Sequence, residues 1–282
     1  MIGKTRQQNA GQSTDFNAQS RTVFGQGCGV LRHSPTPGSF QHLRYAPSSA
    51  LAGWVQHFWI ESWDLRGSDS QTREVLPHPN VQFAFARGRS RIYGIQLRRF
   101  VRELKGADRI MGITFRAGAF YPFLRAPVFS IANASIPAQQ VFGNVAEAEQ
   151  EILSCSDDRQ MVDAASRFLL ANLPAHDPVV ETACWAVKQI AADPAITRVQ
   201  HLASRCGIHH RTLQRIFTRY VGASPLSVIK RYRVYDALEQ LTHGKRLEWA
   251  TLAQDLGYFD QAHFINDFKK MVGRSPTAYL EI

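Results

Sequence analysis

The chain has few cysteines, and none of them lie close together in the sequence. No C-x-x-C motif joins any two of the four, which are Cys28, Cys155, Cys184 and Cys206. This spacing indicates neither a zinc site nor a dithiol redox motif, and scattered thiols are typical of a reducing cytoplasm. The histidines at 33, 42, 57 and 78 also lack H-x-H spacing. We therefore expect no metal ion and no cofactor.

Long apolar runs and the common catalytic motifs are missing as well. No apolar run is long enough to span a bilayer, and no apolar segment follows Lys4 and Arg6 as it would in a secretory signal. We find no G-x-S-x-G, no P-loop and no G-x-G-x-x-G between a strand and a helix. We expect a cytoplasmic protein that has no membrane partner and is not an enzyme.

What the chain does have is an excess of positive charge on a globular composition. Its 282 residues are 44% hydrophobic, enough for one large domain or two ordinary ones. Lys and Arg number 33 against 23 Asp and Glu, which gives a net charge of +10. Clustered cations of this kind favour a polyanionic partner, because they release counterions from a phosphate backbone.

The pattern changes twice along the chain. Residues 1–30 are rich in Gln, Ser, Gly, Asn and Thr, which predicts a flexible tail. Residues from about 40 to 142 carry short apolar runs between Gly and Pro breaks, which favour strands. Helical spacing follows from about residue 145, and LPAHDP at 173–178 is typical of a linker. The runs that favour strands are 81–86, 91–95 and 110–115, whereas 51–60 fits a helix or a strand.

The last hundred residues contain a repeat. Two stretches match residue by residue. As far as the turn glycine, each residue of the second stretch lies 50 positions after its counterpart in the first. Beyond that glycine the separation is 51, because the second stretch has one extra residue. The first is Leu202-Ala203, Gly207, Leu213, Phe217, Gly222 and Ser224-Pro225; the second is Leu252-Ala253, Gly257, Phe264, Phe268, Gly273 and Ser275-Pro276. Such self-similarity indicates two copies of one supersecondary unit.

Each copy has the plan of a helix-turn-helix. A short helix with a small Ala comes first, a Gly supplies the turn, and a second helix carries inward apolar positions. Ser-Pro then starts the next helix, with Ser as N-cap and Pro at the first position. Residues 225–241 form one amphipathic helix of about 25 Å. It could hold two recognition helices about one DNA turn, roughly 34 Å, apart.

Basic residues gather in the same region. Residues 198–235 contain no Asp or Glu. Their cations are Arg198, Arg205, Arg211, Arg215, Arg219, Lys230, Arg231 and Arg233. Because the cluster coincides with the helix-turn-helix pattern, we interpret it as a DNA-facing surface rather than an ordinary solvated face.

These residues resemble a known family. GYFDQAHFINDFKKMVGRSPTAYL at 257–280 is similar to the signature of AraC/XylS-type transcription regulators, and RTLQR at 211–215 with Phe217 fits the first unit. Two positions depart from the pattern: Leu280, where the family usually has Arg, and His209, where a smaller N-cap is usual. The resemblance implies an α+β chain. A β-rich N-terminal sensor and oligomerisation domain (31–175, a barrel or sandwich plus helices) would precede an all-α domain of two helix-turn-helix units joined by a long helix (178–282).

The resemblance also implies which residues meet double-stranded DNA. The base-reading positions fall on Arg211, Gln214, Arg215, Gln261, Ala262 and Asn266. Arg pairs with guanine and Gln or Asn with adenine, while Ala could touch only a thymine methyl. His210, Arg219 and Lys269 are expected on the DNA backbone, where contacts position the protein without reading sequence.

The N-terminal part is expected to hold a small-molecule effector, as family members of this build do. Aromatic residues supply apolar wall material, and Arg116 lies in an otherwise apolar run where it could bind an anion. The effector candidates are Trp59, His78, Arg116 and Tyr121. Aromatic residues and lone histidines are more often structural, so a structural role is the alternative for these residues. The apolar faces of the following helices suggest a homodimer.

Three functions remain open. The leading one is a ligand-responsive transcription activator that also contacts RNA polymerase, as the resemblance implies. The second is a constitutive DNA-binding regulator whose N-terminal domain only oligomerises. The third is a DNA-repair methyl acceptor fused to the same module, which the isolated Cys28 and Cys155 argue against because that activity needs a reactive Cys in a zinc cluster.

Overall fold

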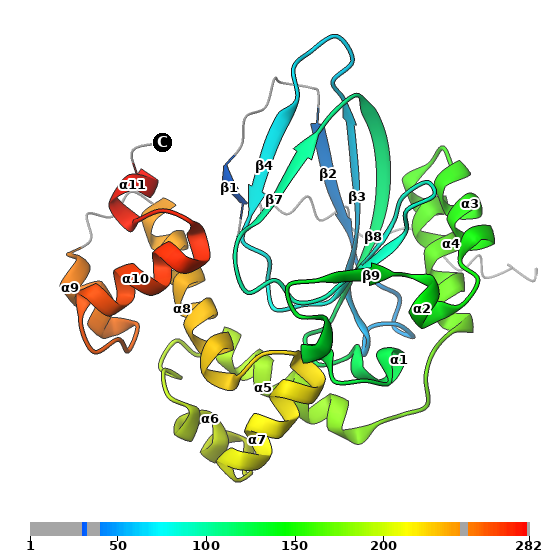
Figure 1. The fold of residues 1–282 in the computed structure, drawn as a ribbon. Helices are drawn as coiled ribbons and strands as arrows, with labels where there is room; N and C mark the ends of the chain where they lie inside the picture. Colours follow the sequence, from blue (N-terminus) through cyan, green and yellow to red (C-terminus); the bar gives the residue numbers. More distant parts are fainter. Residues whose placement is uncertain (1–29, 33–39, 243–247, 281–282) are drawn as a thin grey trace, which may run out of the picture.

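The computed structural model describes residues 30–32, 40–242 and 248–280, and Figure 1 shows two sheets beside a group of helices. The tail expected over 1–30 therefore lies, except for Val30, outside the described residues. None of the helices described is both long and apolar enough to cross a membrane. The expected α+β fold is confirmed: strands occupy the N-terminal part, and helices alone follow residue 137.

Two antiparallel sheets form the β-rich region, the name used below for residues 30–171. The larger sheet has the strand order β2-β3-β8-β5-β6-β9 and the smaller β1-β4-β7. The strands of the larger sheet are β2 (Phe40–Tyr45), β3 (Val55–Asp64), β5 (Gln82–Phe85), β6 (Arg91–Tyr93), β8 (Ala107–Phe115) and β9 (Ser135–Pro137). Those of the smaller are β1 (Val30–Arg32), β4 (Gln71–Val75) and β7 (Phe100–Leu104). The expected strands at 81–86, 91–95 and 110–115 are thus present as β5, β6 and β8.

Strand β3 contributes side chains to a different apolar core on each face of the larger sheet. Phe58 and Ile60 point into the main apolar core, whereas Trp59 and Trp63 join a smaller core on the other face. This period of two is what a strand with both faces covered requires. Trp59 lies across Gly112 of β8, where an added Cβ would come within 2.0 Å of the indole. The ambiguous segment 51–60 is therefore a turn followed by strand from Val55.

A polar cluster joins the two sheets beside that smaller core. The carboxylate of Glu61 on β3 lies 2.8 Å from a guanidinium nitrogen of Arg73 on β4 and 3.6 Å from one of Arg102 on β7. His42 approaches the same carboxylate at 3.0 Å. Burial by itself would raise the pKa of Glu61, but the hydrogen bond to His42 and the two guanidinium groups lower it below its usual range. The ionised carboxylate therefore links the two sheets.

Short helices cover the other face of the larger sheet, and Figure 1 shows α3 and α4 beside it. Phe83 and Phe85 of β5 meet Phe142 and Phe168 with ring centroids 5.1–6.0 Å apart. Asp157 caps α4 by accepting hydrogen bonds from two backbone amides. The elements are α1 (Tyr121–Leu124), the 3₁₀ helix η1 (Val128–Ile131), α2 (Gln139–Phe142), α3 (Ala146–Ser154) and α4 (Asp158–Ala171).

The C-terminal helices contain the predicted repeat. The first unit consists of α6 (Val199–Cys206), α7 (His210–Ile216) and the π-helical turn η2 (Phe217–Val221). The second consists of α9 (Trp249–Asp255) and α10 (Gln261–Val272). The remaining helices are α5 (Pro178–Ala192), α8 (Pro225–Thr242) and α11 (Pro276–Leu280). Gly222 and Gly273 end the second helix of each unit with φ of 89° and 88°, as expected for glycine at this position.

The first unit shares one hydrophobic core with the β-rich region. That core runs from Phe58 and Phe115 through α5 to Leu213 and Phe217. Gly222 lies so close to Val128 of η1 that an added Cβ would come within 2.8 Å of it. The expected domain boundary falls in the irregular segment 173–177, and a division there stays a prediction because the core continues across it.

The second unit has its own core but touches the β-rich region through a polar joint. Leu76 enters this second core, and the Tyr235 hydroxyl donates a hydrogen bond to the Leu76 carbonyl. The ring of His78 stacks on Tyr235 with centroids 4.2 Å apart. Glu74 lies 2.7 Å from Arg274 of the second unit. The end of β4 and the loop after it therefore hold α8 and the second unit against the smaller sheet.

Phe268→Ala should lower the free energy of unfolding by about 3–5 kcal/mol, since it removes a fully buried ring. Phe268 packs edge-on against Phe264 and Tyr279. Phe259→Ala is the matched control, because Phe259 is 92% exposed and its loss should change stability by less than ~0.5 kcal/mol. Urea denaturation measures both, and equal stability of the two variants would contradict the core placement of Phe268.

Stability should also fall as the pH drops from about 6.5 to about 4. Burial, with Arg44 and Arg231 nearby, lowers the pKa of His78 to about 4. In the unfolded chain this imidazole takes up a proton near pH 6.5, so acid favours the unfolded state by on the order of 3 kcal/mol. His78→Gln should flatten the stability profile across this range. A residual slope is expected from His57, whose pKa burial lowers to about 3; an unchanged slope in the variant would contradict the buried neutral His78.

Candidate nucleic-acid interface

Helix α7 separates an apolar face from a polar one. Leu213 and Phe217 are fully buried, whereas Arg211, Gln214 and Arg215 are exposed. The exposed positions follow i, i+3 and i+4 spacing, which puts them on one side of the helix. The three base-reading candidates of the first unit therefore lie together, and the buried face holds them in a fixed orientation.

His209, the unusual N-cap residue, performs the capping role. Its ring nitrogen Nδ1 accepts a hydrogen bond from the backbone amide of Arg211 at 3.3 Å. The N-cap side chain thus satisfies one of the amides that a helix N-terminus leaves free. The departure from the family pattern at this position leaves the start of α7 intact.

Helix α10 repeats the arrangement in the second unit. Phe264 and Phe268 are fully buried, and Gln261, Ala262 and Asn266 are exposed. Asp260 caps the helix, its side chain accepting from the backbone amide of His263 at 2.7 Å. The caps at both helices leave the first turns accessible, as a helix that enters a major groove by its N-terminal residues requires.

The basic cluster at 198–235 is only partly a surface, which corrects the interpretation of the whole cluster as DNA-facing. Arg231 and Arg233 are 1% exposed. Arg231 donates to the carbonyl of Pro77 and Arg233 to that of Ile190, each at 2.6 Å. Buried cations need such partners because desolvation is costly. The sequence pattern could not separate these two structural arginines from the others.

Two further cations of the cluster form ion pairs within the helical part. Arg205 on α6 pairs with Asp193. Lys230 on α8 pairs with Asp267 on α10 at 2.6 Å and so ties the second unit to the long helix. Arg198, Arg211 and Arg215 are exposed and form no ion pair within the described residues. With Arg219, they are the exposed members of the cluster that form no ion pair within the described residues.

The three candidate backbone contacts lie in different surroundings. His210 and Lys269 are exposed, one at the start of α7 and the other late in α10. Arg219 is also exposed, but its guanidinium donates to the Tyr121 hydroxyl and lies 4.5 Å from the centroid of that ring. The hydrogen bond to Tyr121 raises the pKa of Arg219. The β-rich region thus holds one of the three in place.

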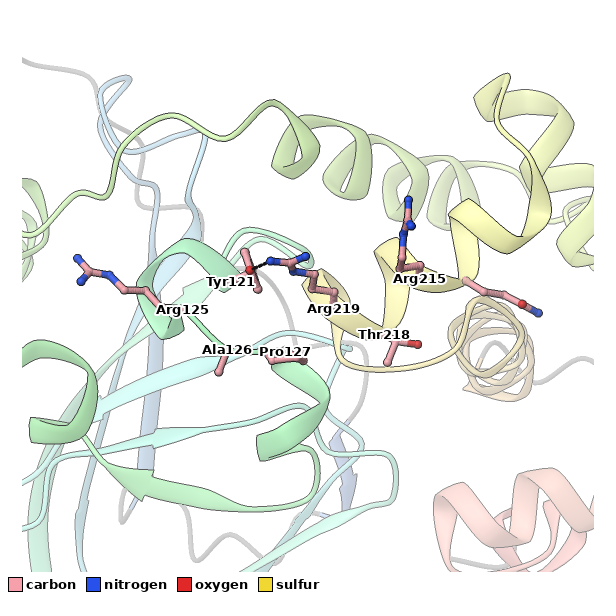
Figure 2. Close-up of a pocket in the computed structure, with 8 residues that line it drawn as sticks. Tyr121, Arg125, Ala126, Pro127, Arg215, Thr218 and Arg219 are labelled. Carbon is pink, nitrogen blue, oxygen red and sulfur yellow. Dashed lines mark hydrogen bonds between the residues drawn. The ribbon is translucent and has the colours of Figure 1, made fainter.

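A hollow opens beside this contact, and Figure 2 shows its two walls. One wall is the end of α1 and the turn after it, and the other is the exposed side of α7 and η2. The basic hollow, as we call it, has a volume of about 580 Å³. Its lining residues are Tyr121, Arg125, Ala126, Pro127, Gln214, Arg215, Thr218 and Arg219. Arg125 and Thr218 were missed by the sequence analysis, because nothing local to residue 125 shows that it lies near α7.

The four effector candidates do not come together in one site. Trp59 is 8% exposed in the smaller core, and His78 stacks on Tyr235 in the polar joint. Arg116 is exposed and its Nε donates to the carbonyl of Ala52. Tyr121 contacts Arg219 at the basic hollow. Each candidate thus has a partner of its own within the protein.

The cysteines of the described residues are free thiols, and two of them are stabilised in the protonated form. Cys155, Cys184 and Cys206 form no disulfide. Burial raises the pKa of Cys184 to about 11 and also raises that of Cys206. A thiol reacts as its thiolate, so these two are poor nucleophiles. Across the described ranges, no group of three or more His, Cys, Asp or Glu side chains is arranged to hold a metal ion.

Comparison with known families and structures identifies two segments of the chain. Residues 43–137 match a Domain of unknown function (DUF6597), and residues 202–282 match a Helix-turn-helix domain. The second match covers both units described above. A search of curated proteins gives no match to the chain.

Several solved structures share parts of the architecture. The chain is similar to the DNA-binding domain of AdpA, a global transcriptional factor, in complex with a target DNA: 26% identity, 38% of this chain, 92% of that one and a TM-score of 0.30. It is also similar to ToxT from Vibrio cholerae, at 12% identity, over 86% of this chain and 98% of that one, with a TM-score of 0.36. ToxT bound to an unsaturated fatty acid gives 13% identity, 88% and 96% coverage and a TM-score of 0.35.

All three TM-scores lie below 0.5, so the assignment depends on the family match and on the helices themselves. The match at 202–282 covers the repeated units. In each unit the second helix, α7 or α10, has a capped and exposed first turn and packs on buried aromatic residues. The predicted resemblance is confirmed for this part of the chain. Residues 202–282 are therefore a helix-turn-helix domain, the domain predicted from the repeat.

Proposed function

We propose that the chain binds double-stranded DNA sequence-specifically by placing α7 and α10 in successive major grooves. The observation that carries the proposal is the common arrangement of the two helices, each with a buried aromatic side and an exposed, capped first turn. Helix α8, with 18 residues, extends about 27 Å. One turn of DNA is about 34 Å, so a spacer of this length suits neighbouring grooves.

The exposed side chains supply the chemistry of base recognition. Arg211 and Arg215 can each pair with a guanine, and Gln214 with an adenine. In the second unit, Gln261 and Asn266 offer adenine contacts, and Ala262 fits a thymine methyl. His210, Arg219 and Lys269 are proposed to contact phosphates, which sets the register of the protein on the duplex.

The β-rich region is proposed to sense a small molecule and to change the DNA affinity of the units. Support comes from its contacts: the first unit shares its core, and the second is held by the loop after β4. A ligand that favoured one arrangement of these contacts would shift DNA binding by its differential affinity. Activation through RNA polymerase, a homodimer and a cytoplasmic location belong to the same proposal.

Arg215→Ala should reduce the binding free energy by about 1–3 kcal/mol, because it removes the contact to one base of the preferred site. The preference for that base should then weaken. The measurement is the affinity for duplexes varied at single positions. Arg87→Ala is the control, because Arg87 is exposed in the turn after β5, where Gly88 contacts Glu149 of α3. Equal weakening on every sequence would show that Arg215 contacts only the backbone.

A small-molecule effector should raise the melting temperature of the full chain and change its DNA affinity at the same concentration. At 100 times its dissociation constant, a ligand stabilises the folded state by about 2.7 kcal/mol. A thermal-shift screen of metabolites measures the first effect, and DNA binding with each hit measures the second. No shift across a broad panel would favour a constitutive regulator with an oligomerising N-terminal region.

A further inference from the structure

The basic hollow brings together two segments of the chain that carry no carboxylates. Residues 109–146 contain Arg109, Arg116 and Arg125 but no Asp or Glu, and residues 194–235 contain the eight cations of the basic cluster. The hollow lies where α1 of the first segment meets η2 of the second. None of its eight lining residues is acidic, so the local field favours an anion.

Arg125 is the cation that the β-rich region adds to this surface. It is exposed and takes part in no ion pair within the described residues. It ends α1 with a left-handed backbone, φ 55°, and its amide donates to the carbonyl of Tyr121 at 2.8 Å. Phe120 and Phe123 of this segment are buried in the main core. A rigid turn therefore presents the side chain, which Figure 2 shows extending outward.

Tyr121 connects this turn to the first unit. Its hydroxyl accepts a hydrogen bond from Arg219, and its ring lies under the same guanidinium. A second ring, that of Tyr220, packs 4.4 Å from Tyr121, and the Tyr220 hydroxyl donates to Asp177 at 2.8 Å. The Asp177 carboxylate also accepts a hydrogen bond from the backbone amide of Val179 in the first turn of α5. Arg219 is held by the Tyr121 side chain and forms no ion pair within the described residues.

The hollow also adjoins the proposed base-reading surface. In Figure 1 the first unit lies between the second unit, on its left, and α1, on its right. Gln214 and Arg215 of α7 line the hollow on the wall opposite Arg125. Phosphates follow one another about every 3.4 Å along each strand. A strand that passes Arg219 thus offers further phosphates to a cation on the neighbouring wall.

We propose that the turn after α1 is a third DNA contact, in which Arg125 binds a backbone phosphate next to the groove that α7 reads and Tyr121 positions Arg219 on the same strand. The proposal builds on the proposed DNA recognition by α7 and α10. It adds the β-rich region to the DNA-binding surface. Arg125 supplies affinity without reading sequence, because a phosphate contact is the same for every base pair.

The test uses the full chain and a duplex enriched by the wild-type protein from a random-sequence pool. Arg125→Gln should weaken binding about 3- to 10-fold on every sequence, and the slope of log affinity against log salt should fall by about 0.9, the value for one phosphate. Base preferences should not change. Arg125→Lys should keep the slope, and Arg87→Gln serves as the control. Melting temperatures confirm that all variants fold.

Tyr121→Phe tests the positioning role. It removes the hydrogen bond to Arg219 and keeps the ring, so binding should weaken by a smaller factor than in Arg125→Gln. The loss should vanish in the Arg219→Gln background, because Tyr121 then has nothing to position. An equal loss with and without Arg219 would assign Tyr121 a merely structural role and overturn this part of the proposal.

Other outcomes distinguish the remaining possibilities. If no sequence is enriched by the wild type, the proposed DNA recognition itself fails. If enrichment succeeds and Arg125→Gln keeps both affinity and slope, the third contact is absent. Tighter DNA binding by Arg125→Gln would overturn the proposal and make the turn a barrier to DNA. A calorimetric signal with inorganic phosphate that needs Arg125, together with an unchanged DNA slope, would make the hollow a site for free anions and also overturn it.

Discussion

The continuous apolar core between the larger sheet and the first helix-turn-helix unit is the constraint on which the rest of the structure depends. Phe58 and Phe115 of the sheet, the helix α5 and Phe217 of the first unit belong to the same core. Interiors of this kind are closely packed and do not deform gradually. The orientation of α7, and with it the position of Arg211 and Arg215, is therefore set by the β-rich region as much as by the unit itself.

The second unit is joined to the β-rich region by hydrogen bonds and ion pairs in addition to apolar contact. Its own aromatic core is separate, and Tyr235, Arg231 and Arg274 reach the loop after β4 and the carboxylate of Glu74. Hydrogen bonds and ion pairs are directional, so they specify one arrangement, yet each contributes modestly to stability. The joint at the first unit is therefore apolar, whereas the joint at the second combines the buried Leu76 with hydrogen bonds and ion pairs. A shift in the sheet would move α7 with it through the shared core.

Much of the interface could be predicted from the sequence, because the signals are local. The alternation of buried and exposed positions on α7 follows from a helical period that Leu213, Phe217 and their neighbours already display. Gly222, Gly273 and the Ser-Pro pairs mark helix ends through their backbone preferences. The Oγ of Ser224 accepts from the amide of Ser227 at 3.1 Å, as the capping pattern predicts.

Contacts between segments that are distant in the sequence could not be predicted from these local signals. Charge counting treated Arg231 and Arg233 as surface cations, although Pro77 and Ile190 carbonyls receive them inside the protein. The sequence offered the effector candidates as residues of one pocket. The fold instead places Trp59 in the smaller core and Tyr121 against Arg219. The sequence gives the chemistry of each side chain, but tertiary packing determines which residues it contacts.

The amino-acid sequence by itself determined the two repeated units, the helices proposed to read DNA and the side chains they expose, since periodicity, capping and turns act within a few residues. The tertiary structure alone decided that the first unit shares its core with the sheet, that two arginines are buried and that Arg125 lies across a hollow from α7. Those outcomes depend on contacts between distant residues, such as Arg233 with Ile190 and Arg231 with Pro77, which are 43 and 154 positions apart. No local preference encodes which surfaces meet when such loops close.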